Sequence, residues 1–160
     1  MEIYNDFNTS VEKALSEIDE NWKSYDGLII CGTHNPHDVE ALIAKIKEAR
    51  ETGKPALLIC AGHQLGAVEY ARNVLGVENA MSEEWGILGQ FIVIKRPEGL
   101  KVGLYEGESY WNNYEVVESF DSIWEKAPNF ITVQYHPEYQ SSLDRPHPDL
   151  IKFLNLCRRQ

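Results

Sequence analysis

One cysteine stands where an apolar strand would pass into a helix. Cys60 follows the apolar run 56–59 and precedes Ala61 and Gly62, two small residues that allow a tight strand-to-helix turn. Such a turn exposes the side chain, the start of the helix favours a thiolate, and its backbone N–H groups can stabilise an oxyanion. A buried, unreactive thiol explains an isolated cysteine equally well, because free cysteines commonly pack as small hydrophobic residues. Cys60 is therefore a candidate nucleophile that needs a partner.

A candidate base and its orienting group lie together in the stretch 133–138, which reads Val-Gln-Tyr-His-Pro-Glu. Residues two apart in an extended chain point to the same side, so His136 and Glu138 can act as a pair. The imidazole would take the thiol proton and the carboxylate would hold the imidazole tautomer. A lone histidine at a strand end is more often structural, but its combination with Cys60 is much more specific. The three side chains together predict catalysis by a thiol nucleophile.

Three further histidines, His34, His37 and His63, would also lie near Cys60 in this arrangement. A zinc site built from them and a cysteine is conceivable, but the His-x-x-His spacing is common by chance. We expect no metal, and we expect these histidines to reshape the substrate pocket. The cysteines at 31, 60 and 157 stand too far apart in sequence for a CxxC zinc site or a disulfide framework.

The elements that must position these residues alternate between short apolar runs and helical patterns. Continuous apolar strands that alternate with amphipathic helices predict a three-layer α/β sandwich with a mainly parallel central sheet. A small antiparallel addition is expected after residue 86. The whole chain, 1–160, is expected to form a single domain. The predicted strands are 28–31, 56–60, 86–94, 100–105, 114–117 and 130–135, and the predicted helices begin near 10, 39, 63 and 148.

Composition excludes several classes of function. The 160 residues include 15 Lys and Arg against 25 Asp and Glu, a net charge of −10, which argues against binding to nucleic acid or to an anionic membrane. No apolar run approaches a membrane span, and the polar start does not resemble a signal peptide. These features predict a cytoplasmic protein with free thiols.

The motifs resemble those of the class I glutamine amidotransferase family, and most of all the glutaminase domain of CTP synthase. Three blocks carry the resemblance: Ile-Cys-Ala-Gly-His-Gln at 59–64 with the helix that follows, Asn-Ala-Met-Ser-Glu-Glu-Trp at 79–85, and Val-Gln-Tyr-His-Pro-Glu-Tyr at 133–139. The resemblance implies the flavodoxin-like fold of that family. It also implies hydrolysis of an amide through a thioester, without a cofactor.

Site residues follow from the resemblance position by position. Cys60 would be the nucleophile, His136 the acid and base, and Glu138 its orienting carboxylate. Gly32, its neighbour Thr33 and the backbone of Ala61 would form the oxyanion and substrate site, together with Gln64, Glu84 and Asn113. The expected partner is a small-molecule amide substrate. A separate synthetase subunit and a homodimer are left open.

Three departures from the family pattern bear on function. Leu58 replaces a glycine two residues before the nucleophile and is expected to crowd the turn, and Thr33 replaces a glycine of the oxyanion loop. Asn113 stands where an arginine would bind the α-carboxylate of glutamine, so free glutamine is expected to be a poor substrate. The preferred hypothesis is a stand-alone amide hydrolase. The alternatives are a related thiol hydrolase with a changed substrate, and a non-catalytic or regulatory domain.

Overall fold

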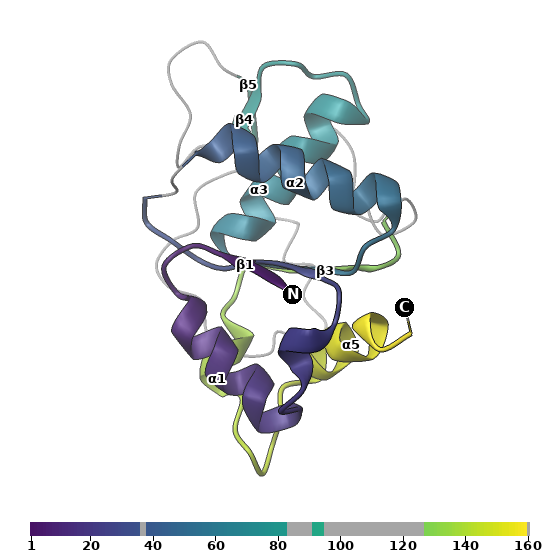
Figure 1. Ribbon diagram of the computed structural model, residues 1–160. Helices are drawn as coiled ribbons and strands as arrows, with labels where there is room; N and C mark the ends of the chain where they lie inside the picture. The colour runs from purple at the N-terminus through teal and green to yellow at the C-terminus, as the bar shows by residue number, and fades with distance from the viewer. Residues whose placement is uncertain (36–37, 83–90, 95–126, 160) are drawn as a thin grey trace.

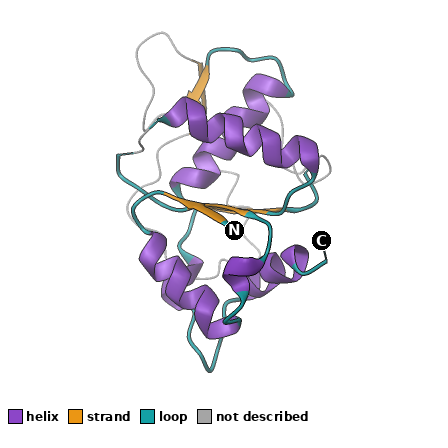
Figure 2. Cartoon of the chain, in the orientation of Figure 1, coloured by secondary structure: helices purple, strands orange, loops and turns teal. Residues whose placement is uncertain are grey.

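The chain folds into three layers, with a parallel sheet between two pairs of helices (Figures 1 and 2). The computed structural model describes residues 1–35, 38–82, the backbone of 91–94, and 127–159. Strands β1 (Glu2–Tyr4), β2 (Leu28–Ile30), β3 (Ala56–Ile59) and β6 (Phe130–Val133) pair in that order, all parallel. Helices α2 (Val39–Thr52) and α3 (Ala61–Asn73) cover one face, and α1 (Asn8–Ile18) and α5 (Pro148–Cys157) cover the other. Short 3₁₀ helices occupy Trp22–Ser24 and Pro137–Gln140. The predicted three-layer sandwich is confirmed.

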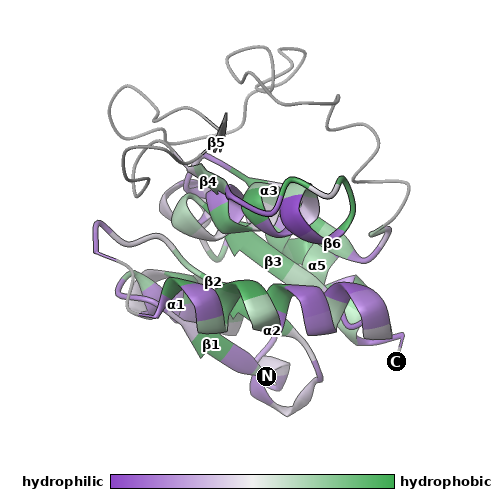
Figure 3. Ribbon diagram, turned by 90° about the horizontal axis from the view of Figure 1, so that it is seen from above, coloured by the Kyte–Doolittle hydropathy of each residue, from purple (hydrophilic) through white to green (hydrophobic). Residues whose placement is uncertain are grey.

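The sheet is buried on both faces, and successive residues of each strand point to opposite layers. In β3, Leu58 packs with α2 and α3, whereas Leu57 and Ile59 pack with α1 and α5. Figure 3 shows the hydrophobic residues gathered on the central strands, while α2 alternates between hydrophobic and hydrophilic residues. This two-sided burial explains why the strands read as continuous apolar runs rather than as alternating ones.

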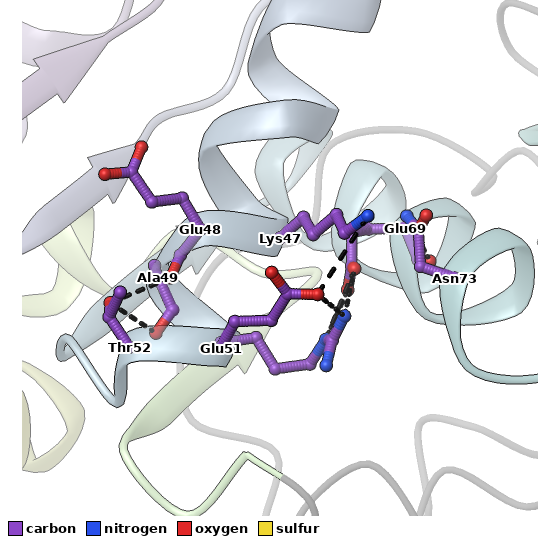
Figure 4. A network of polar contacts seen from close by, with 8 residues as sticks. Lys47, Glu48, Ala49, Glu51, Thr52, Glu69 and Asn73 are labelled. Carbon is purple, nitrogen blue, oxygen red and sulfur yellow. Dashed lines mark hydrogen bonds and ion pairs between the residues drawn. The ribbon is translucent and has the colours of Figure 1, made fainter.

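A nearly buried ion pair links α2 to α3. The Arg50 guanidinium donates from Nε and Nη2 to both carboxylate oxygens of Glu69, with distances between 2.7 and 3.2 Å, and Glu69 is 1% exposed. Glu51 approaches the same guanidinium at 3.7 Å, and Lys47 lies 4.0 Å from Glu51 (Figure 4). A two-point contact of this kind has a defined geometry, so it sets the position of α3 against α2. The turn that carries Cys60 leads directly into α3.

The structure corrects several details of the prediction. In the second half of the chain, β4 (Ala80–Ser82) and β5 (Phe91–Ile94) form a parallel pair that was not expected, and β5 is the only strand of the expected antiparallel addition within the described residues. Neither β4 nor β1 was predicted, because Ala-Met-Ser and Glu-Ile-Tyr are short and lack the continuous apolar run that marks the other strands. The strands expected at 100–105 and 114–117 lie outside the described residues. Helix α3 begins at Ala61, earlier than expected, because the chain turns into it immediately after Cys60. None of the described helices has the length and apolar character needed to cross a membrane.

Candidate active site

Cys60 occupies a strained turn at the carboxyl end of β3. Its backbone has φ 53° and ψ −104°, and only two other described residues besides glycine, Asn5 and Asp38, have a positive φ. Its N–H donates to the carbonyl of Val133 at 2.8 Å, and its carbonyl accepts from the N–H of Gln64 at 3.1 Å. One residue thus ends the β3–β6 ladder and begins α3. Backbone strain of this kind gathers at functional sites, and the half-buried thiol is placed where parallel sheets form their sites.

Two glycines of α3 make this turn possible. A Cβ at Gly62 would lie only 2.2 Å from the carbonyl oxygen of Ile30, so any side chain there would push the helix off the sheet. A Cβ at Gly66 would lie 2.8 Å from Cδ1 of Leu58. Leu58 was expected to crowd the turn at Cys60. It is instead fully buried beside Gly66, whose missing side chain leaves it room.

His136 and Glu138 form a close, buried pair next to Cys60. His136 follows β6, the neighbour of β3, so the two strand ends carry the thiol and the imidazole to the same edge of the sheet. Nδ1 of His136 lies 2.7 Å from Oε1 of Glu138, and the two residues are 1% and 6% exposed. Among the described residues, Nε2 of His136 and Oε2 of Glu138 have no hydrogen-bond partner. The free Nε2 is the atom that would receive a proton from a thiol.

The electrostatics of the pair favour a charged imidazole. Burial lowers the pKa of His136, but interaction with the Cys60 thiol and with the Glu138 carboxylate raises it more strongly, to about 9. The Cys60 thiol therefore lies within interaction range of the imidazole. It makes no well-aligned hydrogen bond to Nε2, and such contacts are often loose in an active site without substrate.

Two aromatic rings enclose the imidazole, and neither was singled out from the sequence. Tyr139 stacks on His136 with ring centroids 5.3 Å apart, and Phe7 meets it edge-on at 5.8 Å. Tyr139 belongs to the sequence block around His136 and could have been chosen on that ground. Phe7 carries no local signal, since it reaches the site from the distant turn between β1 and α1. Rings on two sides restrict the rotation of His136 and exclude water from it.

The loop 31–35, after β2, lies against both Cys60 and His136. A Cβ at Gly32 would lie 2.7 Å from Cε1 of His136 and 3.4 Å from Cβ of Cys60, so Gly32 touches both candidate catalytic residues. Thr33 is buried, and its hydroxyl donates to Oδ2 of Asp6 at 2.6 Å. Thr33 is not among the residues with positive φ, so a threonine fits the backbone of this loop without strain where the resembled family has a glycine.

The other predicted site residues divide into two groups. Ala61 and Gln64 lie in the first turn of α3 and are fully buried, and the side-chain oxygen of Gln64 accepts a short hydrogen bond from the hydroxyl of Ser82. The first N–H groups of a helix have no intrahelical acceptor, so the backbone here can serve as an oxyanion donor. Glu84 and Asn113 lie outside the described residues.

The histidines expected around Cys60 do not form one cluster in the described part of the chain. His63 is buried, its Nδ1 lies 2.8 Å from the hydroxyl of Thr132, and burial lowers its pKa to about 3. It is therefore neutral near pH 7 and cannot replace a missing arginine as a cation. His34 is exposed and meets Phe7 edge-on, and His37 lies outside the described residues. Across the described ranges, no three His, Cys, Asp or Glu side chains gather as metal ligands would.

Comparisons with known proteins agree with this architecture. The family model "Glutamine amidotransferase class-I" matches residues 4–120, which include Cys60 but end before His136. CTP synthase of Methanoculleus marisnigri is 32% identical over 84% of this chain and 34% of its own length. CTP synthase of Clostridium perfringens is 31% identical over 94% of this chain and 38% of its own length. The chain thus spans little more than a third of the length of these relatives.

A solved structure shares the fold. The glutaminase domain of Trypanosoma brucei CTPS, solved with bound acivicin, has a TM-score of 0.68 and 16% identity, covering 99% of this chain and 92% of that one. Three findings agree: the resemblance in the three sequence blocks, the strained cysteine turn at the carboxyl end of a strand in a parallel sheet, and a family match over most of the chain. This chain belongs to the class I glutamine amidotransferase family.

Proposed function

We propose that the protein is an amide hydrolase that cleaves glutamine, or an amide resembling the γ-glutamyl group, through a thioester on Cys60. One observation carries this proposal: the strained Cys60 turn lies beside a His136–Glu138 pair whose Nε2 is free, and Gly32 touches both partners. A buried structural cysteine would need neither the strain nor the oriented imidazole.

The reaction follows from the positions of these groups. Cys60 Sγ, whose proton is already held by Nε2 of His136, attacks the amide carbonyl carbon as a thiolate. The carbonyl oxygen gains the negative charge, next to the first N–H groups of α3 and the loop at Gly32. When the tetrahedral intermediate collapses, His136 returns the proton to the leaving nitrogen and ammonia departs. Water, deprotonated by the same imidazole, then hydrolyses the thioester, and the thiol and the carboxylic acid are formed.

Glu138 determines which ring nitrogen of His136 carries out this proton transfer. Its carboxylate accepts the Nδ1 proton of His136, so Nε2 is the nitrogen left to act as the base, and it stabilises the imidazolium that forms. Phe7 and Tyr139 pack against the ring and limit its rotation. Because His136 and Glu138 are buried away from water, each of these electrostatic interactions is stronger than it would be in solvent.

The substrate and the fate of ammonia are further parts of the proposal. The solved neighbour carries acivicin, and the relatives are CTP synthases about three times as long, which supports a glutamine-type amide and an ammonia-consuming synthetase partner. Three free cysteines fit a reducing compartment such as the cytoplasm.

The test is a screen of glutamine and γ-glutamyl amides for release of ammonia or amine, with Cys60→Ser as the control. Labelling by acivicin, followed by mass spectrometry, supplies a second measurement that does not depend on turnover. We expect release by the wild type, none by Cys60→Ser, and a single acivicin adduct on Cys60. Absence of both turnover and labelling would contradict the proposal.

A non-catalytic role is the second candidate, and Asn113 favours it, because the resembled family has an arginine for the substrate carboxylate there. The Asn113→Arg variant separates the two. For a hydrolase of glutamine-like amides we expect measurable wild-type activity and a roughly tenfold or greater gain in kcat/KM for free glutamine with the added arginine. For a binding domain, neither protein releases ammonia.

A further inference from the structure

The short turn between β1 and α1 is attached to the loop 31–35 at three successive residues. The Asn5 side-chain amide donates to the carbonyl of Cys31 at 3.0 Å, and the backbone N–H of Phe7 donates to the carbonyl of Gly32 at 3.3 Å. Between them, Asp6 accepts the hydroxyl proton of Thr33 at 2.6 Å. The turn itself is held in an unusual shape, with Asn5 at φ 78°. These contacts join segments that are far apart in sequence.

The Thr33 hydroxyl is the centre of this attachment. While it donates to Asp6, its oxygen accepts the backbone N–H of Asn35 at 3.1 Å, so one side chain ties the turn to both halves of the loop. Thr33 is 3% exposed, whereas Asp6 is exposed. A hydrogen bond from a hydroxyl to a carboxylate is short and strong for its type. Asp6 makes no other hydrogen bond or ion pair among the described residues, so its contribution passes through Thr33.

We propose that Asp6 is a positioning residue: acting through Thr33, it holds the loop 31–35 so that Gly32 stays against Cys60 and His136 and its backbone faces the developing oxyanion. This inference rests on the proposed hydrolase activity and adds to it a residue that touches neither substrate nor thiol. A displacement of about 1 Å in a group that stabilises a transition state is costly, whereas substrate binding in the ground state changes little.

The chemistry also says which property of Asp6 is needed. A negative charge near an oxyanion opposes its formation, so the carboxylate is useful as a hydrogen-bond acceptor and not as a charge. The amide oxygen of asparagine can accept the same hydroxyl proton. Asp6→Asn should therefore keep the position of the loop, and Asp6→Ala should lose it. At the other end of the contact, Thr33→Ser keeps the hydroxyl and Thr33→Val removes it with little change of shape.

The experiment measures two properties of these four variants and of the double variant Asp6→Ala with Thr33→Val. The first is the rate of hydrogen exchange at the backbone amides of residues 31–35, which does not depend on catalysis. The second is kcat and KM for the best amide found in the substrate screen. Asp19→Ala is the matched control, because Asp19 accepts hydrogen bonds from Tyr25 and Arg158 at the other end of α1.

We expect Asp6→Ala and Thr33→Val each to speed exchange in the loop and to lower kcat about tenfold or more, with KM nearly unchanged. Asp6→Asn should stay close to the wild type in both properties, and Thr33→Ser should keep the slow exchange of the loop. The double variant should be no worse than Thr33→Val, because Thr33→Val by itself already removes the contact with Asp6. Asp19→Ala should lower the melting temperature without changing the exchange of the loop or kcat.

Unchanged exchange in Asp6→Ala, or faster exchange with an unchanged kcat, overturns the inference. Failure of the hydrolase proposal looks different: the wild type itself then shows neither turnover nor an acivicin adduct. In that case the positioning role of Asp6 is overturned as well, and faster exchange in Asp6→Ala would show a structural contact only.

Discussion

Nδ1 of His136 lies 2.7 Å from Oε1 of Glu138, in a pair that is almost entirely buried and stands two residues apart on a single turn of chain. Burial alone would leave this imidazole neutral. The carboxylate and the Cys60 thiol reverse that effect and raise the pKa of His136 to about 9. The pKa of the imidazole that exchanges a proton with the thiol is thus set by a carboxylate on one side and by the thiol itself on the other.

Replacing Glu138 by glutamine should lower both the pKa of His136 and the turnover rate. The amide keeps the size of the carboxylate but removes its charge, so burial is opposed by the thiol alone. We expect a loss of about a hundredfold or more in kcat, because the tautomer and the imidazolium lose their support. Titration of the His136 ring signals by NMR measures the pKa directly. Glu40→Gln, which removes the exposed partner of Arg72, should leave both quantities unchanged.

Stability should fall between about pH 6.5 and pH 9. The pKa of His136 is raised in the fold above its ordinary value of about 6.5, so the folded protein binds this proton more tightly than the unfolded chain does. The resulting stabilisation, a few kcal/mol at most, is complete below about pH 6.5 and is lost as the pH rises through about 9. Urea unfolding at pH 6, 7.5 and 9.5 checks this. A difference between wild type and Glu138→Gln that does not shrink with rising pH would contradict it.

Cys60 should react with iodoacetamide much faster than the other two thiols. It is half-buried, whereas Cys31 and Cys157 are buried and burial raises the pKa of each, to about 12 for Cys157. We expect a difference in rate of at least about tenfold near neutral pH, read by mass spectrometry of the modified peptides. Equal rates for all three cysteines in the folded protein would mean that the turn does not activate the thiol.

Gly32→Ala should damage activity more than stability. The new methyl group would meet His136 and Phe7 at 2.7 and 2.9 Å, so the imidazole must move. Overpacking of this kind costs about 1–3 kcal/mol in unfolding free energy. Gly76→Ala is the control: its φ of 77° makes alanine unfavourable by about 1 kcal/mol, but nothing lies within 4 Å of the added carbon. We expect thiol reactivity and turnover to collapse in the first variant only.

Leu58 and Gly66 should show a coupling that changes sign. In the wild type, Gly66→Ala places a methyl group 2.8 Å from Cδ1 of Leu58 and should destabilise the protein by about 1 kcal/mol. In the Leu58→Ala background the same change fills space and favours the helix, so it should stabilise by about 0.5–1 kcal/mol. Denaturant unfolding of the four proteins completes the cycle. Additive effects would show that Leu58 has room elsewhere.

The candidate catalytic groups could be read from the sequence because each has a local signal. An apolar run that stops at Cys60 and is followed by small residues predicts a strand, a sharp turn and a helix, and this is what forms. Parallel strands buried on both faces read as continuous apolar runs, so the layered fold could also be predicted. His136 and Glu138 stand two residues apart, so a carboxylate beside the ring required only local geometry.

Other features were decided only by the tertiary structure, because they depend on residues that meet across the fold. Phe7 and Asp6 reach the site from the first turn of the chain, and neither has a pattern that points there. Leu58 is accommodated because Gly66, on the helix packed above it, lacks a side chain. His63 was expected to help shape the substrate pocket, yet it is buried beside Thr132 and burial keeps it neutral. Sequence patterns record the periodicity of single elements, whereas burial, close approach and pKa depend on which elements pack together.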